Sequence, residues 1–311
     1  MLQAVSRTFF HLLAGSQSLK RAASRYGMGA RGGFARRFIA GETVEEAIDA
    51  ARQIQANGLG VTLDYLGESV ASIAEADAAT RAYIAVIETI AASGIERNIS
   101  LKLTQLGLTI DRATCVDNLR RILDAAASRD FFVRIDMENS PFTAVTFEVF
   151  ETVWQQGYRN TGVVLQSYLP RSEADAARMN ELGARVRLVK GAYKEPRDAA
   201  YQSMADVDAA FVRIMRILLA GGHYPAMATH DPAMIEATRA FALERGIDPA
   251  AYEFQMLYGI RRDLQSSLKR EGRRVRVYVP FGREWFPYFM RRLGERPANI
   301  GFVIRGVLGE R

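Results

Sequence analysis

Eight runs of β-branched and aliphatic residues recur along the chain, and a stretch with helical periodicity follows each of them. The predicted strands lie at residues 59–64, 98–104, 131–136, 162–167, 186–190, 225–230, 252–257 and 274–279. Strands that alternate with helices in this way run parallel, because each helix carries the chain back across the sheet. Eight such units in about 240 residues fit a closed (β/α)8 barrel better than an open, doubly wound sheet.

Local signals support the helices between these strands. Thr43 and Glu46 form a capping box before one helix, and Asp231 followed by Pro232 is a typical start of another. No linker rich in serine or glycine, low-complexity tract or strong internal repeat divides the chain. We therefore expect a basic helical arm over residues 1–41 and one barrel domain over residues 42–311, which ends in a C-terminal helix.

The formal net charge of +6 is unevenly distributed. Residues 1–41 hold seven basic and no acidic residues, residues 261–311 hold 13 basic and 5 acidic, and residues 42–260 hold 21 basic and 30 acidic. The basic N-terminal segment has neither a reading motif nor basic residues interleaved with stacking aromatics, so no nucleic-acid partner is expected. Residues 5–14 fit an amphipathic helix on a membrane surface, part of a transit peptide, or an arm packed on the barrel.

Cysteine and histidine content limits the chemistry of the chain. The single cysteine, Cys115, excludes an intramolecular disulfide and zinc sites built from several thiolates, and three scattered histidines do not make a metal centre. A glycine pattern at residues 27–32 has no strand before it, so it does not predict a dinucleotide site. No P-loop, nucleophile elbow or metal-ligand spacing is present, and no run approaches the ~20 apolar residues of a membrane-spanning helix.

Polar side chains stand at the ends of the predicted strands, where a barrel enzyme builds its active site. In the second strand, Lys102 alternates with apolar neighbours, so we expect its side chain to point into the barrel. Burying such groups unpaired would cost roughly 1–3 kcal/mol each. The pattern therefore predicts a polar cavity, lined from successive strands by Asp64, Lys102, Asp136, Gln166, Arg187, Lys190, Thr229, His230, Gln255 and Tyr278.

Residue chemistry alone leaves several functions open. A strand-end lysine, Lys190 or Lys102, is suited to form a Schiff base with a carbonyl substrate, as in a lyase. Alternatively, the cavity holds a cofactor that performs the difficult step while the protein orients it. A non-catalytic basic binding protein is the third possibility.

Several segments in the right order resemble the flavin-dependent proline dehydrogenases. They are LDYLGE at 63–68, SLK at 100–102, RIDME at 134–138, RLVKGAY at 187–193, ATH at 228–230, EFQML at 253–257, YVPFG at 278–282 and YFMRR at 288–292, followed by Glu295. The resemblance covers about residues 40–304, and the short chain is similar to the bacterial monofunctional form. It implies a distorted (β/α)8 barrel that oxidises L-proline to Δ1-pyrroline-5-carboxylate, the first step of proline catabolism to glutamate.

The resemblance also implies partners. The substrate hydride passes from C5 of L-proline to N5 of FAD, and the electrons then pass to a membrane quinone. A separate pyrroline-5-carboxylate dehydrogenase is expected to take the product. These implications place the protein in the cytoplasm, peripherally associated with the inner face of the cell membrane.

By position, the resemblance assigns residues to the substrate. It implies that Lys102, Arg291 and Arg292 clamp the carboxylate, in keeping with the bidentate fit of guanidinium to carboxylate. Tyr278, Tyr288 and Leu257 are expected to wall the ring. Asp136 is expected to support Tyr278 or the flavin edge, and Glu68 with Arg291 to form an ion-pair gate over bound substrate.

The remaining assignments concern the flavin. Arg187 is expected near N5, where a cation stabilises the negative charge of reduced flavin. Gln166 is expected to contact the isoalloxazine, and Gly191 to let the backbone approach the cofactor closely. The resemblance further implies binding by Met137, Lys190, Ala192 and Gln255, with Thr229 and His230 at the phosphates or ribose on the ADP side.

Overall fold

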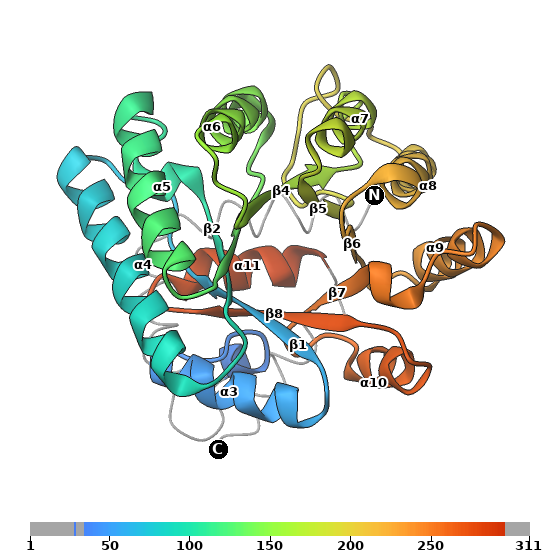
Figure 1. The fold of residues 1–311 in the computed structure, drawn as a ribbon, viewed down its shortest axis with the longest axis horizontal. Helices are drawn as coiled ribbons and strands as arrows, with labels where there is room; N and C mark the ends of the chain where they lie inside the picture. The colour runs from blue at the N-terminus through green and yellow to red at the C-terminus, as the bar shows by residue number, and fades with distance from the viewer. Residues whose placement is uncertain (1–27, 29–33, 296–311) are drawn as a thin grey trace.

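The strands form a closed parallel barrel. The computed structural model describes residue 28 and residues 34–295 (Figure 1). The strands are β1 (Gly60–Tyr65), β2 (Asn98–Leu101), β3 (Phe132–Ile135), β4 (Thr161–Gln166), β5 (Arg185–Val189), β6 (Ala226–Ala228), β7 (Glu253–Leu257) and β8 (Val275–Phe281). Each strand pairs with its neighbours in the sequence, and β8 pairs with β1 to close the sheet. The predicted (β/α)8 barrel is confirmed.

β2 and β6 are each three residues shorter than the sequence predicted. β2 stops at Leu101, because the chain turns into the 3-10 helix η2 (Leu103–Leu106) directly after Lys102. β6 stops at Ala228, after which Asp231 caps the next helix by accepting a hydrogen bond from Ala233. In both places the chain leaves the ladder where polar side chains begin, so the polar strand ends belong to loops at the barrel mouth.

Helices surround the barrel (Figure 1). They are α3 (Val44–Ala56), α4 (Ile73–Ser93), α5 (Arg112–Ala127), α6 (Thr143–Gln155), α7 (Ser172–Leu182), α8 (Met204–Gly221), α9 (Pro232–Glu244) and α10 (Arg262–Arg270), with 3-10 turns η3 (Ser140–Phe142) and η4 (Pro249–Ala251). The predicted capping box at Thr43 and Glu46 is present, and Pro232 is the first residue of α9. Cys115 lies buried in α5.

Strand alternation divides the interior into two layers. In β1 the apolar Val61 and Leu63 belong to the core between strands and helices, whereas the intervening Thr62 and Asp64 are polar. Both kinds of residue are fully buried. Successive side chains of a strand point to opposite faces, so the polar set lies inside the barrel.

The last helix, α11 (Trp285–Glu295), leaves the outer ring. α3 instead packs on both β1 and β8, where the barrel closes. Figure 1 shows α11 within the ring of outer helices. Its Trp285 and Phe289 form a second apolar cluster with Phe38 and with Leu66, which follows β1. This displacement places α11 at the carboxyl end of β1, over the mouth of the barrel.

The described part of the N-terminal segment packs on the barrel. The 3-10 helix η1 (Phe34–Arg37) leads into Phe38 and Ile39, which are buried in the cluster with α11. Gly41 O accepts a hydrogen bond from Gly282 N at 2.9 Å, which ties the segment to the end of β8. The predicted amphipathic helix at residues 5–14 lies outside the described residues. Within the described part of the chain, no helix is long and apolar enough to cross a membrane.

Candidate active site

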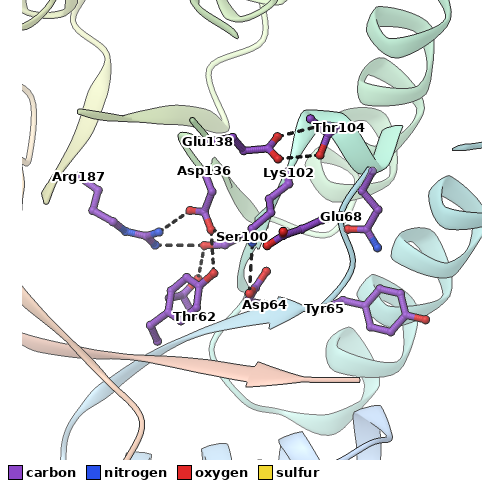
Figure 2. A network of polar contacts seen from close by, with 12 residues as sticks. Thr62, Asp64, Tyr65, Glu68, Ser100, Lys102, Thr104, Asp136, Glu138 and Arg187 are labelled. Atoms are coloured by element: carbon purple, nitrogen blue, oxygen red, sulfur yellow. Dashed lines mark hydrogen bonds and ion pairs between the residues drawn. The ribbon is translucent and has the colours of Figure 1, made fainter. Parts of the chain in front are cut away.

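Asp136 joins side chains from three other strands at the mouth of the barrel. It follows β3, and its Oδ1 accepts a hydrogen bond from Arg187 Nη1 on β5 at 2.6 Å. Its Oδ2 accepts from the Tyr278 hydroxyl on β8 at 2.7 Å and lies 3.6 Å from Lys102 Nζ, just after β2. Figure 2 shows Arg187 and Lys102 approaching Asp136 from different sides. The aspartate therefore fixes two cations and a phenol in one cavity.

Arg187 is held on every side. Its Nε donates to Gln255 Oε1 at 2.5 Å, and its Nη2 donates to Ser100 Oγ at 3.1 Å (Figure 2 shows the serine contact). The guanidinium carbon lies 5.2 Å from the centre of the Tyr278 ring. A buried cation with this many partners has one position, which pre-organises positive charge at this point of the cavity.

Lys102 lies between two carboxylates. Its Nζ is 3.5 Å from Asp64 Oδ2 and 3.6 Å from Asp136 Oδ2, and its side chain is 8% exposed. Burial works against the ammonium, but the charges of Asp64 and Asp136 outweigh it and raise the pKa of Lys102 well above its usual value. A lysine must be neutral to attack a carbonyl, so this environment suits ionic binding and disfavours Schiff-base formation.

Lys190, the second candidate nucleophile, also forms ion pairs with carboxylates. Lys190 Nζ lies 2.6 Å from Asp231 Oδ2 and 2.5 Å from Asp208 Oδ1. These contacts tie the end of β5 to α8 and to the start of α9. The structure therefore places Lys190 away from the network around Asp136, at the β5–β6 side of the mouth.

Glu68 and Arg291 form a bidentate ion pair between the β1–α4 loop and α11. The two contacts measure 2.5 Å and 3.1 Å. Burial acts to raise the pKa of Glu68, but the charges of Arg291 and Lys102 bring it below the usual value. Beside the pair lies a cavity of about 380 Å³, bounded by α4, α11 and the end of β1. The predicted gate residues thus meet at the edge of the barrel mouth.

The remaining substrate candidates lie around this mouth. Tyr288 is buried on α11, and the Arg292 guanidinium carbon is 5.1 Å from the centre of its ring. Leu257 ends β7, and its backbone N donates to His230 Nε2 at 3.0 Å. That bond makes Nε2 an acceptor, which orients the imidazole and ties the ends of β6 and β7 together.

The flavin candidates line the ends of β3 to β7. Met137, Gln166, Thr229 and Gln255 are buried, whereas Lys190, Gly191, Ala192 and His230 are half-buried. Gln166 is the most informative of them, because its Oε1 is buried and accepts no hydrogen bond from any described residue. A buried amide oxygen without a donor suits a ligand that brings an N–H group, as a flavin ring does.

The structure supplies a reason for a glycine at position 191 that the sequence did not reveal. Gly191 has a φ of +115°, and a Cβ built there would overlap the Tyr168 ring at its Cε1 atom. The glycine is therefore required by a neighbouring protein side chain and by its backbone conformation. Its close approach to a cofactor stays a prediction.

The sequence interpretation assigned no role to three buried carboxylates of the mouth. Asp64 was predicted to line the polar cavity, and the structure shows that it faces Lys102. Glu138 accepts hydrogen bonds from the backbone N and the hydroxyl of Thr104, at 3.1 Å and 2.6 Å (Figure 2). Glu195 accepts from Ser140 N at 2.8 Å. The last two join loops that are distant in sequence, which no local pattern reveals.

Comparison with known proteins agrees with this geometry. The family model described as Proline dehydrogenase matches residues 47–305. The chain belongs to the proline dehydrogenase family. In the residues that the structure describes, no three His, Cys, Asp or Glu side chains are grouped to hold a metal ion.

Individual relatives are similar over most of the chain. Proline dehydrogenase 2 of Bacillus subtilis is 41% identical over 303 residues, which cover 97% of this chain and 99% of the relative. The proline dehydrogenase of Deinococcus radiodurans is 44% identical over 278 residues, which cover 88% of this chain and 90% of the relative. Both support the family resemblance read from the sequence.

A solved structure is similar in fold. The crystal structure of proline utilization A from Bdellovibrio bacteriovorus, inactivated by N-propargylglycine, superposes with a TM-score of 0.79 at 28% identity. The match covers 84% of this chain and 32% of that chain, so this chain spans about a third of the length of that protein. The distorted barrel of the proline dehydrogenase family is thereby confirmed as the fold.

Replacing Gly191 by alanine is expected to destabilise the mouth of the barrel. The positive φ alone costs about 1–3 kcal/mol, and the new methyl group also displaces the Tyr168 ring. Thermal unfolding of Gly191→Ala should therefore occur at a lower temperature than that of Gly157→Ala, where φ is +99° and a Cβ meets nothing within 4 Å. Equal losses in the two variants would contradict the role of Tyr168.

Proposed function

We propose that this chain oxidises L-proline to Δ1-pyrroline-5-carboxylate by passing a hydride from C5 to the N5 atom of bound FAD. The observation that carries the proposal is the arrangement of charge in the barrel mouth. Lys102, Arg187 and Arg291 each pair there with a fixed carboxylate. Gln166, at the end of β4 between β3 and β5, adds a buried amide oxygen that has no donor among the described residues. Because the chain belongs to the proline dehydrogenase family, L-proline is the proposed substrate.

The substrate carboxylate is proposed to bind Lys102, Arg291 and Arg292. A charged ammonium and two planar guanidinium groups suit a carboxylate, and such bonds fix the substrate in one orientation. Arg291 is already paired with Glu68. An incoming carboxylate therefore competes with Glu68 for the same guanidinium, which is the physical basis for the proposed gate.

The pyrrolidine ring is proposed to lie against Tyr278, Tyr288 and Leu257. Tyr278 cannot swing freely, since its hydroxyl donates to Asp136 and its ring faces Arg187. A wall fixed in this way limits the size of the ring that fits. Asp136 acts here as a positioning residue through Tyr278 and Arg187.

FAD is proposed to lie along the ends of β3 to β7. Gln166 and Gln255 would meet the ring system with Met137, Lys190, Gly191 and Ala192 beside it, and Thr229 and His230 would meet the phosphate or ribose side. When bound, the flavin supplies the hydride acceptor. Arg187, fixed and charged, would stabilise the negative charge that hydride transfer creates.

The electron acceptor is proposed to be a membrane quinone. A cytoplasmic protein held at the inner face of the cell membrane by its basic ends would have access to it, because cationic segments bind anionic lipid. The product is proposed to pass to a separate pyrroline-5-carboxylate dehydrogenase. The Bacillus relative of nearly equal length supports this monofunctional arrangement.

The purified protein is expected to be yellow, and its visible flavin spectrum should bleach when L-proline is added without oxygen. A soluble quinone should then restore the absorbance. A colourless protein that borohydride traps covalently with its substrate would instead indicate a Schiff-base lyase. Absence of both colour and trapping, with salt-sensitive binding to nucleic acid or anionic vesicles, would indicate a basic binding protein.

Replacing Arg291 or Arg292 by methionine should raise the KM for L-proline by about 10- to 100-fold or more, because a charged hydrogen-bond partner of the carboxylate is lost. The flavin should stay bound, which its absorbance per protein reports. Arg120→Met, at an exposed site on α5, is the control and should leave KM unchanged. Loss of flavin with unchanged KM would contradict the proposed clamp.

Replacing Lys20, Arg21 and Arg25 by glutamine should weaken binding to anionic vesicles about 100-fold, since each basic residue contributes about 1 kcal/mol at such a surface. Sedimentation with phosphatidylglycerol vesicles measures this, with phosphatidylcholine vesicles as the uncharged comparison. The same exchange at the exposed Arg52, Arg120 and Arg245 is the matched control. Equal effects of the two triple variants would argue against membrane contact through the N-terminal segment.

A further inference from the structure

The proposed oxidation of L-proline requires a group that accepts the proton of the substrate amine. The identity of that group is inferred here and rests on the proposed function. L-Proline carries a protonated secondary amine at neutral pH. Its nitrogen lone pair must be free before a hydride can leave C5, because that lone pair forms the new C=N bond. A base in the cavity is therefore required, and it must lie within hydrogen-bond reach of the amine.

Most ionisable groups of the mouth are unsuited to accept a proton. Asp136 uses one carboxylate oxygen for Arg187 and the other for Tyr278, so both oxygens are already engaged. Glu68 is held by both arms of Arg291. Lys102 is already protonated, as its pair of carboxylates requires.

Asp64 differs from these groups. It lies on β1 with no exposed surface, and neither of its carboxylate oxygens accepts a hydrogen bond from any described residue. Lys102 Nζ approaches Oδ2 to 3.5 Å, which is an ionic contact (Figure 2). The Tyr278 hydroxyl also faces Asp64, but its single proton is donated to Asp136. Both oxygens of Asp64 thus keep unused acceptor capacity.

We propose that Asp64 accepts the proton of the substrate's secondary amine. The N–H bond breaks, and its proton forms an O–H bond with the Asp64 carboxylate. The nitrogen lone pair then forms the C=N bond as the C5–H bond breaks, and the hydride leaves with its electron pair for the flavin. Asp64 would then hold the proton as a neutral carboxylic acid, and the two electrons of the hydride would be taken up by the bound flavin.

The structure of the substrate determines which groups its amine can reach. In L-proline the amine nitrogen and the carboxylate carbon are bonded to the same carbon atom. A carboxylate that sits on Lys102 therefore brings the amine close to the groups that flank Lys102. Asp64 flanks it on one side, and on the other side Asp136 has its oxygens engaged.

The environment favours proton uptake by Asp64. Burial raises the pKa of Asp64, the charge of Lys102 opposes this, and the charge of Asp136 adds to it, so that the pKa lies above its usual value. An aspartate with a raised pKa is a stronger base, which general-base catalysis near neutral pH requires. The titratable groups that face Asp64 are Lys102 after β2, Asp136 after β3, Tyr278 on β8, Glu68 in the β1–α4 loop and Tyr83 on α4.

The test is Asp64→Asn, which keeps the size of the side chain but removes its basicity. It is made once the wild-type protein has been seen to bleach with L-proline, so failure of the proposed function is recognised separately. We expect kcat/KM for L-proline to fall about 100-fold or more near neutral pH. The loss should shrink as pH rises, because solvent then supplies more of the neutral amine.

Glu138→Gln is the matched control. Glu138 is another buried carboxyl at the mouth, but Thr104 occupies both of its oxygens, so any loss of kcat/KM should be the same at every pH. A loss in Asp64→Asn that does not change with pH would reduce Asp64 to a structural role and overturn the proposal. Unchanged activity, or the same pH-dependent loss in Glu138→Gln, would also overturn it.

A second readout does not depend on turnover. Infrared difference spectra of the first anaerobic reduction by L-proline should show a new protonated-carboxyl band in the wild type and none in Asp64→Asn. Absence of the band in the wild type would contradict the proposal.

Asp64→Glu is the alternative variant if Asp64→Asn does not fold. It retains a carboxyl group in a shifted position, so the acidic limb of the pH profile of its kcat/KM should move. An acidic limb that stays in place would overturn the assignment.

Discussion

The mouth of this barrel depends on the compensation of buried charge. An isolated ion inside a protein is very costly, so each buried cation needs an anion with good geometry. Lys102 and Arg187 are matched here by Asp64 and Asp136, and Arg291 is matched by Glu68. The cavity is thus balanced before any substrate enters. In the proposed clamp, a substrate carboxylate would disturb that balance and compete most directly with Glu68, whose partner Arg291 lies on α11 at the edge of the mouth.

A chain of hydrogen bonds that begins at the opposite end of the barrel holds Arg187 in position. Arg276, near the start of β8, donates to Glu253 Oε1 at 2.8 Å, and Glu253 Oε1 also accepts from Gln255 Nε2 at 2.5 Å. That bond orients the Gln255 amide so that its oxygen faces Arg187. A chain of charge-assisted bonds therefore runs through the barrel from its floor to its mouth. It makes the fold itself the support of the site, because the linked side chains come from β5, β7 and β8.

The sequence reveals the features that depend on the alternation of side chains along a strand and on the order of strands and helices. It reveals far fewer of the features that depend on contact between distant segments. Strand alternation sufficed to place Lys102 inside the barrel, and the order of the eight units sufficed for the fold. The bidentate pair of Glu68 with Arg291 joins residues more than 200 positions apart, and only family resemblance suggested it. Glu195 and Ser140 carry no local signal, since neither lies in a periodic element. The requirement for Gly191 depends on the Tyr168 ring, which a linear pattern does not show.

The displacement of α11 brings the Glu68–Arg291 ion pair and residues 34–39 into one packed unit. α3 covers β1 and β8 from outside, so the helix after β8 is free to turn over the mouth. There it buries Trp285 and Phe289 against Phe38, and Leu66 of the β1–α4 loop joins the same cluster. Leu66 lies two residues before Glu68, so both halves of the ion pair are carried by segments that share an apolar contact. Such a contact is non-directional and tolerates small shifts, whereas a bidentate ion pair does not. In the proposed gate, the ion pair would therefore break while the apolar cluster keeps α11 over the barrel.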